Sequence, residues 1–236
     1  MSWLSSLVKA VASLFTPRKA PSPVPRMEVG MNVHRLLDED VALLRQMGVK
    51  HLRISLYVDG DGSQWIDRAM AEGFAVLVCS YRSVLIRAVD RERWPSAVWQ
   101  YGNEPDVPLH VSWVVGLAAG GEVSCGFRNE TTAADLHAYA QAADPLQIIA
   151  THIYGDSLVD AVTNRLVTVT SLTRRVWVTE IGKVGGDAYD LYDALTLLQT
   201  AGIERTYVYA LWSPDDGYTL TPGQRQAIAS FNAGRV

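Results

Sequence analysis

The 236-residue sequence predicts a single compact (β/α)8 barrel, the TIM-barrel architecture, and three observations support this prediction. Apolar residues make up 48% of the chain and charged residues 19%, a balance typical of a globular protein with a large core. From residue 27 onward, eight strand-like runs alternate with eight helix-like segments. An open doubly wound sheet is the alternative, but no Gly-x-Gly-x-x-Gly motif follows the first strand-like run.

The expected strands are short apolar runs at 27–33, 51–57, 74–80, 97–102, 122–127, 146–154, 175–182 and 205–212. Amphipathic segments predict helices between and after them, at 38–47, 64–72, 83–93, 108–118, 131–143, 156–165, 188–201 and 222–233. A chain of about 210 residues is near the lower limit for eight such units. We therefore expect short loops and no second large domain.

The first 26 residues form a separate segment ahead of the barrel at 27–236. Apolar residues at helical spacing predict an amphipathic helix: Trp3, Leu4, Leu7, Val8, Val11, Leu14 and Phe15. Four prolines between Pro17 and Pro25 then predict a stiff, extended tether. The apolar stretch is too short for a transmembrane segment, and no basic residues precede it as they do in a signal peptide. We expect the helix to dock on the barrel, a partner chain, a larger assembly or a membrane surface. The sequence leaves cytoplasmic, cell-surface and virion-associated locations open.

Charge and cysteine content exclude several classes of function. The net charge is −4, with 21 basic and 25 acidic residues interspersed, so the chain lacks the basic patch of a nucleic-acid-binding protein. The two cysteines form no Cys-x-x-Cys motif, and no His-x-His motif is present. We therefore expect neither a metal nor a cofactor. Seven Trp and ten Tyr are numerous enough both to fill the core and to bind sugar faces.

Polar residues lie where the expected strands end, and in a barrel of this kind the carboxyl ends of the strands surround the active site. These residues are Asn32, His34, Arg53, Tyr81, Arg82, Asn103, Glu104, Arg128, His152, Tyr154, Glu180 and Trp212, with Asp215 and Asp216 just after it. They include one carboxylate on each of the fourth and seventh strands, and these two face each other across an eight-strand barrel. Hydrolysis of a glycosidic bond requires such a pair, with one carboxyl protonated and the other ionised.

Two motifs link the sequence to a known group of enzymes. Asn103-Glu104-Pro105 ends the fourth expected strand, and Thr179-Glu180 lies near the end of the seventh. With these motifs at these positions, residues 27–236 resemble the retaining glycoside hydrolases of clan A, a superfamily with cellulase-like and xylosidase-like members. The resemblance does not select one family within the clan. It implies hydrolysis of a β-linked polysaccharide or oligosaccharide by double displacement, without a cofactor.

The resemblance implies specific roles for four residues. Glu104 would be the acid/base, and Glu180 would be the nucleophile that attacks the sugar. Asn103 would contact the 2-hydroxyl of the sugar, and Arg53 would keep Glu180 ionised. From the residues alone, Glu104 could instead be an ordinary turn carboxylate, and Glu180 could pair with a neighbouring lysine.

The resemblance and the strand ends together give further candidates for substrate binding. Tyr154, or else His152, would hydrogen-bond the nucleophile, and because they are two residues apart on one strand, one of them could instead fill the core. Trp212 would form a platform for the sugar beside the cleavage point. His34 is a further candidate at the end of the first strand.

Two alternatives remain open at this stage. The glycine-rich run at 182–187 could bind an anion or form a flexible rim loop. The alternative function is a barrel that binds glycans without turnover, as an attachment module of a larger assembly such as a cell surface or virus particle. The presence of both glutamates favours the enzyme, because a protein that only binds glycans has no need of the pair.

Overall fold

The computed structural model describes residues 26–105, 110–182, 187–213 and 218–234. The expected N-terminal helix, nearly all of its tether, and most of the glycine-rich run lie outside the described residues. Within these ranges, no helix has the length and apolar character required to cross a membrane.

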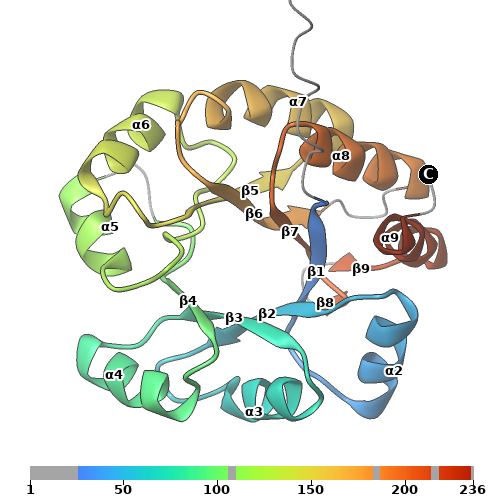
Figure 1. Cartoon of the computed structure of the whole chain (residues 1–236), viewed down its shortest axis with the longest axis horizontal. Helices are drawn as coiled ribbons and strands as arrows, with labels where there is room; N and C mark the ends of the chain where they lie inside the picture. The colour runs from blue at the N-terminus through green and yellow to red at the C-terminus, as the bar shows by residue number, and fades with distance from the viewer. Residues whose placement is uncertain (1–25, 106–109, 183–186, 214–217, 235–236) are drawn as a thin grey trace, which may run out of the picture.

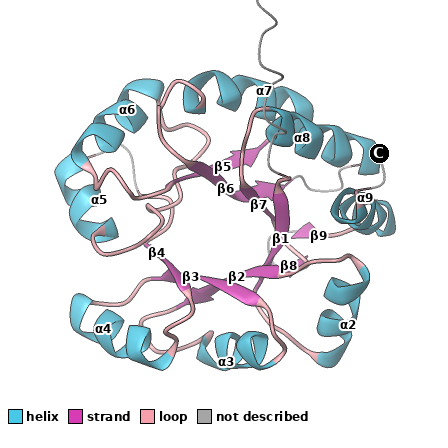
Figure 2. Ribbon diagram, viewed as in Figure 1, coloured by secondary structure: helices cyan, strands magenta, loops and turns pink. Residues whose placement is uncertain are grey.

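Parallel strands curl around a central axis, and helices surround them (Figures 1 and 2). The strands are β1 (Glu28–Val33), β2 (His51–Leu56), β3 (Ala75–Ser80), β4 (Val98–Tyr101), β5 (Ile149–Tyr154), β6 (Val176–Gly182) and β7 (Arg205–Val208). Their order across the sheet is β4-β3-β2-β1-β7-β6-β5. The helices of the described residues are α2 (Asp38–Gln46), α3 (Ser63–Ala71), α4 (Val84–Arg93), α5 (Val111–Ala118), α6 (Ala133–Ala142), α7 (Leu158–Val169), α8 (Ala188–Thr200) and α9 (Pro222–Ala233).

The segment expected as the fifth strand closes the ring between β4 and β5. It makes isolated parallel bridges to both neighbours: Gln100 to Val123, Asn103 to Gly126, Val123 to Ile148, and Phe127 to Thr151. The segment is thus the eighth member of the barrel, and the expected (β/α)8 architecture is confirmed. The segment is not a continuous strand, because glycine weakens a hydrogen-bonded ladder. Position 126 has no room for a residue larger than glycine. A Cβ atom there would lie 2.2 Å from Nε2 of His152.

The last expected strand, 205–212, is shorter than predicted. β7 stops at Val208, although the Tyr209 N–H still donates to the Ile181 carbonyl at 2.8 Å. The Leu211 N–H donates to the Asn32 carbonyl at 3.3 Å, so contact with β1 continues to Leu211, and β8 (Trp212–Ser213) then pairs antiparallel with β9 (Tyr218–Thr219). This two-stranded hairpin is separate from the main sheet.

Several helices begin at side chains that satisfy the free N–H groups of the first turn. The caps are Thr132 for α6, Ser157 for α7, Asp187 for α8 and Thr221 for α9. Outside the barrel, these helices bury apolar faces, as α8 does with Leu191, Ala194, Leu195 and Leu198. Inside it, a smaller apolar cluster fills the lumen: Leu77, Val123, Ile148, Ala150, Trp177 and Tyr207. The lumen is therefore packed, and a ligand reaches the barrel only at its ends.

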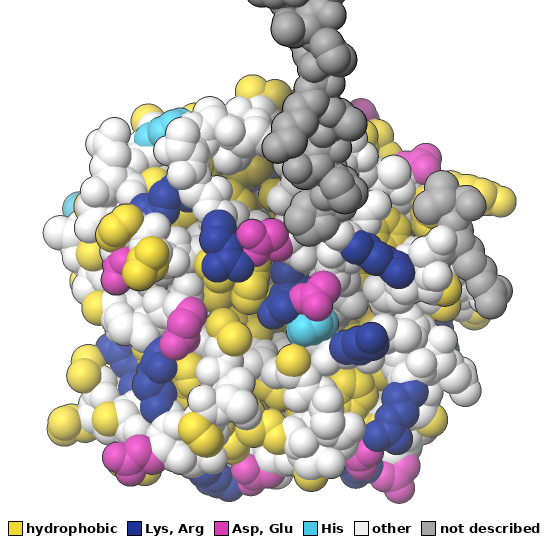
Figure 3. All heavy atoms as spheres, in the orientation of Figure 1, with side chains coloured by type: hydrophobic (Ala, Val, Ile, Leu, Met, Phe, Trp, Pro, Cys, Tyr) yellow, Lys and Arg dark blue, Asp and Glu magenta, His cyan; other side chains and the backbone are white. Residues whose placement is uncertain are grey.

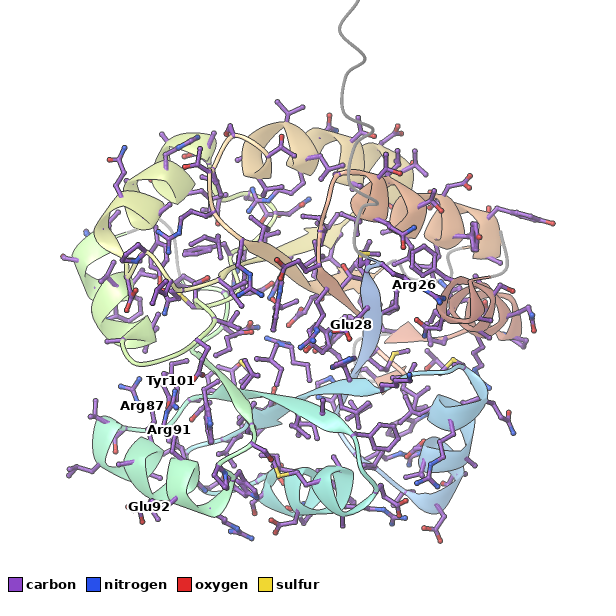
Figure 4. All side chains as sticks on the ribbon, viewed as in Figure 1. Arg26, Glu28, Arg87, Arg91, Glu92 and Tyr101 are labelled. Carbon is purple, nitrogen blue, oxygen red and sulfur yellow. The ribbon has the colours of Figure 1, made fainter. Side chains whose placement is uncertain are left out.

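Ion pairs cover the N-terminal end of the barrel, which faces the viewer in Figures 3 and 4. Glu28, labelled near the axis in Figure 4, pairs with His51 at 3.0 Å and accepts from Nε of Arg205 at 2.9 Å. Burial lowers the pKa of His51 despite this carboxylate. At the edge of the same view, Arg91 donates to the Tyr101 hydroxyl at 3.0 Å. Acidic and basic groups are therefore paired at this end of the barrel.

Two glycines provide a test of how tightly the lumen is packed. In Gly30→Ala, the new Cβ would lie 2.6 Å from the His51 carbonyl oxygen and 2.8 Å from the Tyr207 ring. We expect a loss of about 1–3 kcal/mol in the free energy of unfolding, measured with urea. In Gly116→Ala, on α5, no atom lies within 4 Å of the new Cβ, so we expect a gain of about 0.5–1 kcal/mol. Equal effects of the two substitutions would contradict a packed lumen.

Candidate active site

A cavity of about 460 Å³ lies at the carboxyl ends of the strands. Six of the residues that the sequence analysis singled out line it: His34, Arg53, Asn103, Glu104, Tyr154 and Glu180. His152 is fully buried next to the cavity and contacts both glutamates. The strand ends thus bring seven of the eight candidates to one place.

Trp212 is the candidate that does not join them. It belongs to β8, lies outside the set of residues that line the cavity, and is 41% exposed. The guanidinium of Arg35 lies 4.0 Å from the centre of its ring. Trp212 is not at the end of a barrel strand as expected, because β7 stops at Val208 and Trp212 begins the separate hairpin of β8 and β9.

Arg53, on β2, is the hub of the site. Its side chain is buried, and its nitrogens donate to four acceptors on three other strands or their ends. Nη1 donates to Oε1 of Glu180 at 2.6 Å and to Oδ1 of Asn32 at 2.8 Å. Nη2 donates to Oδ1 of Asn103 at 2.7 Å, and Nε donates to Oε1 of Gln100 at 3.2 Å. Because a guanidinium stays charged at any physiological pH, this network supplies a permanent positive charge beside Glu180.

Glu180, on β6, is held in its ionised form. Burial by itself raises the pKa of a carboxyl, but the charges of His152 and Arg53 and hydrogen bonds from Tyr154 and Arg53 outweigh it. The net result is a pKa below the ordinary value. Burial and the adjoining carboxylate both raise the pKa of Tyr154, so its hydroxyl keeps the proton that it donates to Oε2 of Glu180. Glu180 is thus a dry, fixed carboxylate with its charge balanced by neighbours.

Glu104 has different surroundings. Its backbone has φ 44°, in the left-handed region that side chains other than glycine rarely adopt, and Gly102 just before it has φ 80°. The backbone N–H of Glu104 donates to the Gly126 carbonyl at 2.8 Å, which fixes this bend. The side chain is about one-third exposed and contacts Nδ1 of His152 at 2.8 Å and Nε of Arg128 at 3.3 Å. Glu104 is therefore accessible to solvent, whereas Glu180 is enclosed.

The two carboxylates are close together. An oxygen of Glu104 and an oxygen of Glu180 lie within 4.8 Å of each other, with Nδ1 of His152 between them at 2.8 and 3.4 Å. Carboxyl groups about 5–5.5 Å apart are typical of glycosidases that retain anomeric configuration, whereas inverting enzymes separate them by about 6.5–9.5 Å. The spacing fits the shorter class.

The same three side chains, Glu104, His152 and Glu180, are close enough to hold a metal ion. Their surroundings fit a cation poorly. Arg53 lies 2.6 Å from Glu180 and would repel a cation, while Tyr154 occupies the other oxygen of that carboxylate. The arrangement therefore suits proton transfer between these groups better than metal binding.

Aromatic residues complete the cavity, and most of them escaped the sequence analysis. Tyr57 and Tyr81 follow β2 and β3, and their rings stack at 5.4 Å with an interplanar angle of 4°. Tyr209 and Tyr218 meet edge-on at 5.2 Å, and His34 lies 3.2 Å from the Tyr209 hydroxyl. Tyr57 could have been found as the last residue of an expected strand. Tyr209 lay within an expected strand and Tyr218 in a turn, so neither position pointed to the mouth.

The barrel has the fold of the clan A glycoside hydrolases. The solved structure of XacCel5A with cellopentaose superposes with a TM-score of 0.63 at 11% identity, covering 86% of this chain and 98% of that one. The endo-1,4-β-D-mannanase of Thermotoga petrophila RKU-1 has a TM-score of 0.63 at 12% identity, with 88% and 99% covered. The family 5 enzyme PbGH5A of Prevotella bryantii B14 has a TM-score of 0.56 at 12% identity, with 92% and 99% covered. No family model and no curated protein matches the sequence. At these identities, the likeness is one of fold.

The depressed pKa of Glu180 predicts a pH-dependent contribution to stability. A carboxyl whose folded pKa lies below its unfolded value stabilises the fold above the unfolded pKa, and this is lost as pH falls through the folded pKa. Glu180→Gln should therefore lower the free energy of unfolding more at pH 7 than at pH 3, as measured by urea titration. Glu39→Gln, on the exposed start of α2, serves as the surface control. A loss that is the same at both pH values would contradict the assignment of Glu180 as an ionised group.

Proposed function

We propose that the protein is a retaining glycoside hydrolase that cleaves β-linked polysaccharides or oligosaccharides by double displacement. The observation that supports this most directly is the pair formed by Glu180 and Glu104. One is buried and held ionised, the other is partly exposed, and their oxygens lie within 4.8 Å of each other. Retaining hydrolysis requires two carboxyl groups at close range in different environments.

In the proposed first step, Glu180 attacks the anomeric carbon from one face of the sugar. The bond between that carbon and the glycosidic oxygen breaks, and Glu104 transfers its proton to the departing oxygen. The products are a covalent glycosyl ester on Glu180 and a free leaving group with a new hydroxyl. Arg53 and Tyr154 hold the attacking carboxylate in place, so one oxygen of Glu180 remains oriented while the other reacts.

In the proposed second step, the roles of the two glutamates differ again. Glu104, now ionised, accepts a proton from a water molecule as the water attacks the anomeric carbon. The ester bond to Glu180 breaks and the carboxylate is regenerated. Two inversions leave the sugar with its original β configuration. The exposure of Glu104 supports this role, because solvent reaches it once the leaving group has gone.

Neighbouring groups support binding of a sugar at this point. Asn103 directs Nδ2 toward Oε1 of Glu180 at 3.4 Å, a long contact that a 2-hydroxyl group could replace. The stacked pair Tyr57 and Tyr81 offers an apolar wall to the face of a pyranose ring. Among the solved structures of similar fold are a protein bound to cellopentaose and an endo-1,4-β-D-mannanase, which supports a β-linked glycan as the substrate class.

The roles of the glutamates can be separated by their variants on a panel of β-glucosides, β-mannosides and β-xylosides. Glu180→Gln should abolish turnover of every substrate, because no covalent intermediate can form. Glu104→Ala should lower turnover of natural glycans by about 10²–10⁴-fold, but it should still form the glycosyl-enzyme from an aryl glycoside with a good leaving group. Azide should then restore turnover and give a β-glycosyl azide, identified by NMR.

The azide product discriminates among the alternatives. An α-glycosyl azide from Glu104→Ala would contradict retention. A wild type that binds a glycan without hydrolysing it, unchanged in Glu180→Gln, would point to a binding module. Tyr189→Ala, at an exposed position on α8, serves as a control that should match the wild type in every assay.

The aromatic wall predicts an effect of chain length. Tyr57→Ala removes one ring of the stacked pair, and we expect KM for an oligosaccharide to rise about 3–10-fold with little change in kcat. A short aryl glycoside that does not reach the wall should be unaffected, and Tyr57→Phe should keep most of the affinity. A uniform loss of kcat on long and short substrates would contradict a binding role for this ring.

A further inference from the structure

The carboxylate pair has an enclosed side and an open side. Apart from the two glutamates, the cavity is lined by residues at the ends of β1 to β4, by Tyr154 at the end of β5, and by Tyr209 and Tyr218. Arg128 lies on the open side, outside this lining, and contacts Glu104 from there. If the sugar attacked by Glu180 fills the enclosed side, the leaving group extends past Glu104 toward Arg128. This assignment of sides rests on the proposed function.

Arg128 is well placed to meet a ligand. Its side chain is 43% exposed, and its Nε lies 3.3 Å from Oε2 of Glu104 without hydrogen-bond geometry. Glu104 is the one acidic group within 4.0 Å of it in the part of the chain that the structure describes. A hydrogen bond from Glu104 to the leaving oxygen is about 2.8 Å long, so the guanidinium begins within about 6 Å of that oxygen. This separation is bridged by one sugar ring or one benzene ring.

The loop that presents Arg128 is fixed from beneath by a second arginine. Arg165, on α7, is buried and donates to the carbonyls of Arg128 at 3.0 Å and Thr131 at 2.8 Å. Its Nε donates to the Thr151 hydroxyl at 2.7 Å. Burial lowers the pKa of Arg165 to about 10, which still leaves it charged at neutral pH. Arg128 therefore projects from a rigid support, and less entropy is lost when it binds a ligand.

We propose that Arg128 is a specificity-determining residue that binds an acidic group, a carboxylate or a sulfate, on the leaving-group side of the scissile bond. The substrate class is then a β-linked glycan that carries an anionic sugar or substituent next to the bond that is cleaved. In the first step Glu104 must be protonated and uncharged, so Arg128 loses its counter-charge at that moment. An acidic group on the leaving group replaces it and can use both terminal nitrogens of the guanidinium.

The test uses two aryl β-glycosides of the same sugar, chosen from the panel above, with 3-carboxyphenyl and 3-carbamoylphenyl as leaving groups. The ratio of their kcat/KM values is measured for the wild type, Arg128→Gln and Arg128→Lys. Comparing this ratio between proteins cancels the intrinsic reactivity of the two leaving groups. Arg175→Gln is the matched control, because Arg175 is an exposed arginine paired with Glu204 at the other end of the barrel.

We expect Arg128→Gln to lower the ratio of anionic to neutral substrate by about tenfold, which corresponds to one charge-assisted contact. Arg128→Lys should keep part of the preference, and Arg175→Gln should keep all of it. Added NaCl should weaken the preference of the wild type but not that of Arg128→Gln. An unchanged ratio in Arg128→Gln, with hydrolysis intact, would overturn the proposal and leave the proposed function standing.

Binding measurements separate this proposal from the question of turnover. Calorimetry on Glu180→Gln and on the double variant with Arg128→Gln gives the affinities of the two intact glycosides without hydrolysis. Tighter binding of the anionic glycoside that disappears in the double variant supports the anion site, even if the wild type proves inactive. Equal affinities for both glycosides in Glu180→Gln would overturn it.

Discussion

The buried guanidinium of Arg53 is the constraint on which the candidate active site depends. It joins β2 to Asn32 on β1, to Asn103 after β4 and to Glu180 on β6. A buried charge is tolerated only when its donors are satisfied, and removing one partner of such a pair costs about 3–5 kcal/mol. The strand ends therefore cannot shift independently of one another. The contacts that join the strand ends therefore also fix the positions of the site residues.

This constraint gives the two glutamates different properties although they lie side by side. Glu180 shares the hub, so its charge is fixed and its orientation is set from two sides by Arg53 and Tyr154. Glu104 is linked to the hub less directly, through its neighbour Asn103 and through His152, which contacts both glutamates, and its backbone is strained. Its contacts with His152 and Arg128 come from the other half of the barrel. A strained, partly exposed carboxyl beside a buried, ion-paired one is the arrangement that acid/base chemistry at one carbon atom requires.

Periodicity and strand ends predicted most of the fold and the centre of the site. Parallel strands place their carboxyl ends at one mouth, so Arg53, Glu104, His152 and Glu180 could be brought together from sequence alone. The sequence could not show that the segment between β4 and β5 pairs with these strands through isolated bridges rather than through a continuous ladder. The ring of His152 occupies the space that a side chain at position 126 would need. The two residues are 26 positions apart, so this contact produces no periodic pattern in the sequence.

The residues that form the walls of the cavity, beyond the strands, were harder to predict than the residues on the strands that form its floor. A floor residue is fixed by its strand, whereas a wall residue depends on where the chain turns after the strand ends. Tyr209 and Trp212 are three residues apart, and an early end to β7 places the first in the cavity and the second under Arg35 outside it. With loops this short, the walls consist of single side chains such as Tyr57 and Tyr209. The strands therefore fix the side chains at the base of the cavity, and the first residues beyond each strand fix its shape.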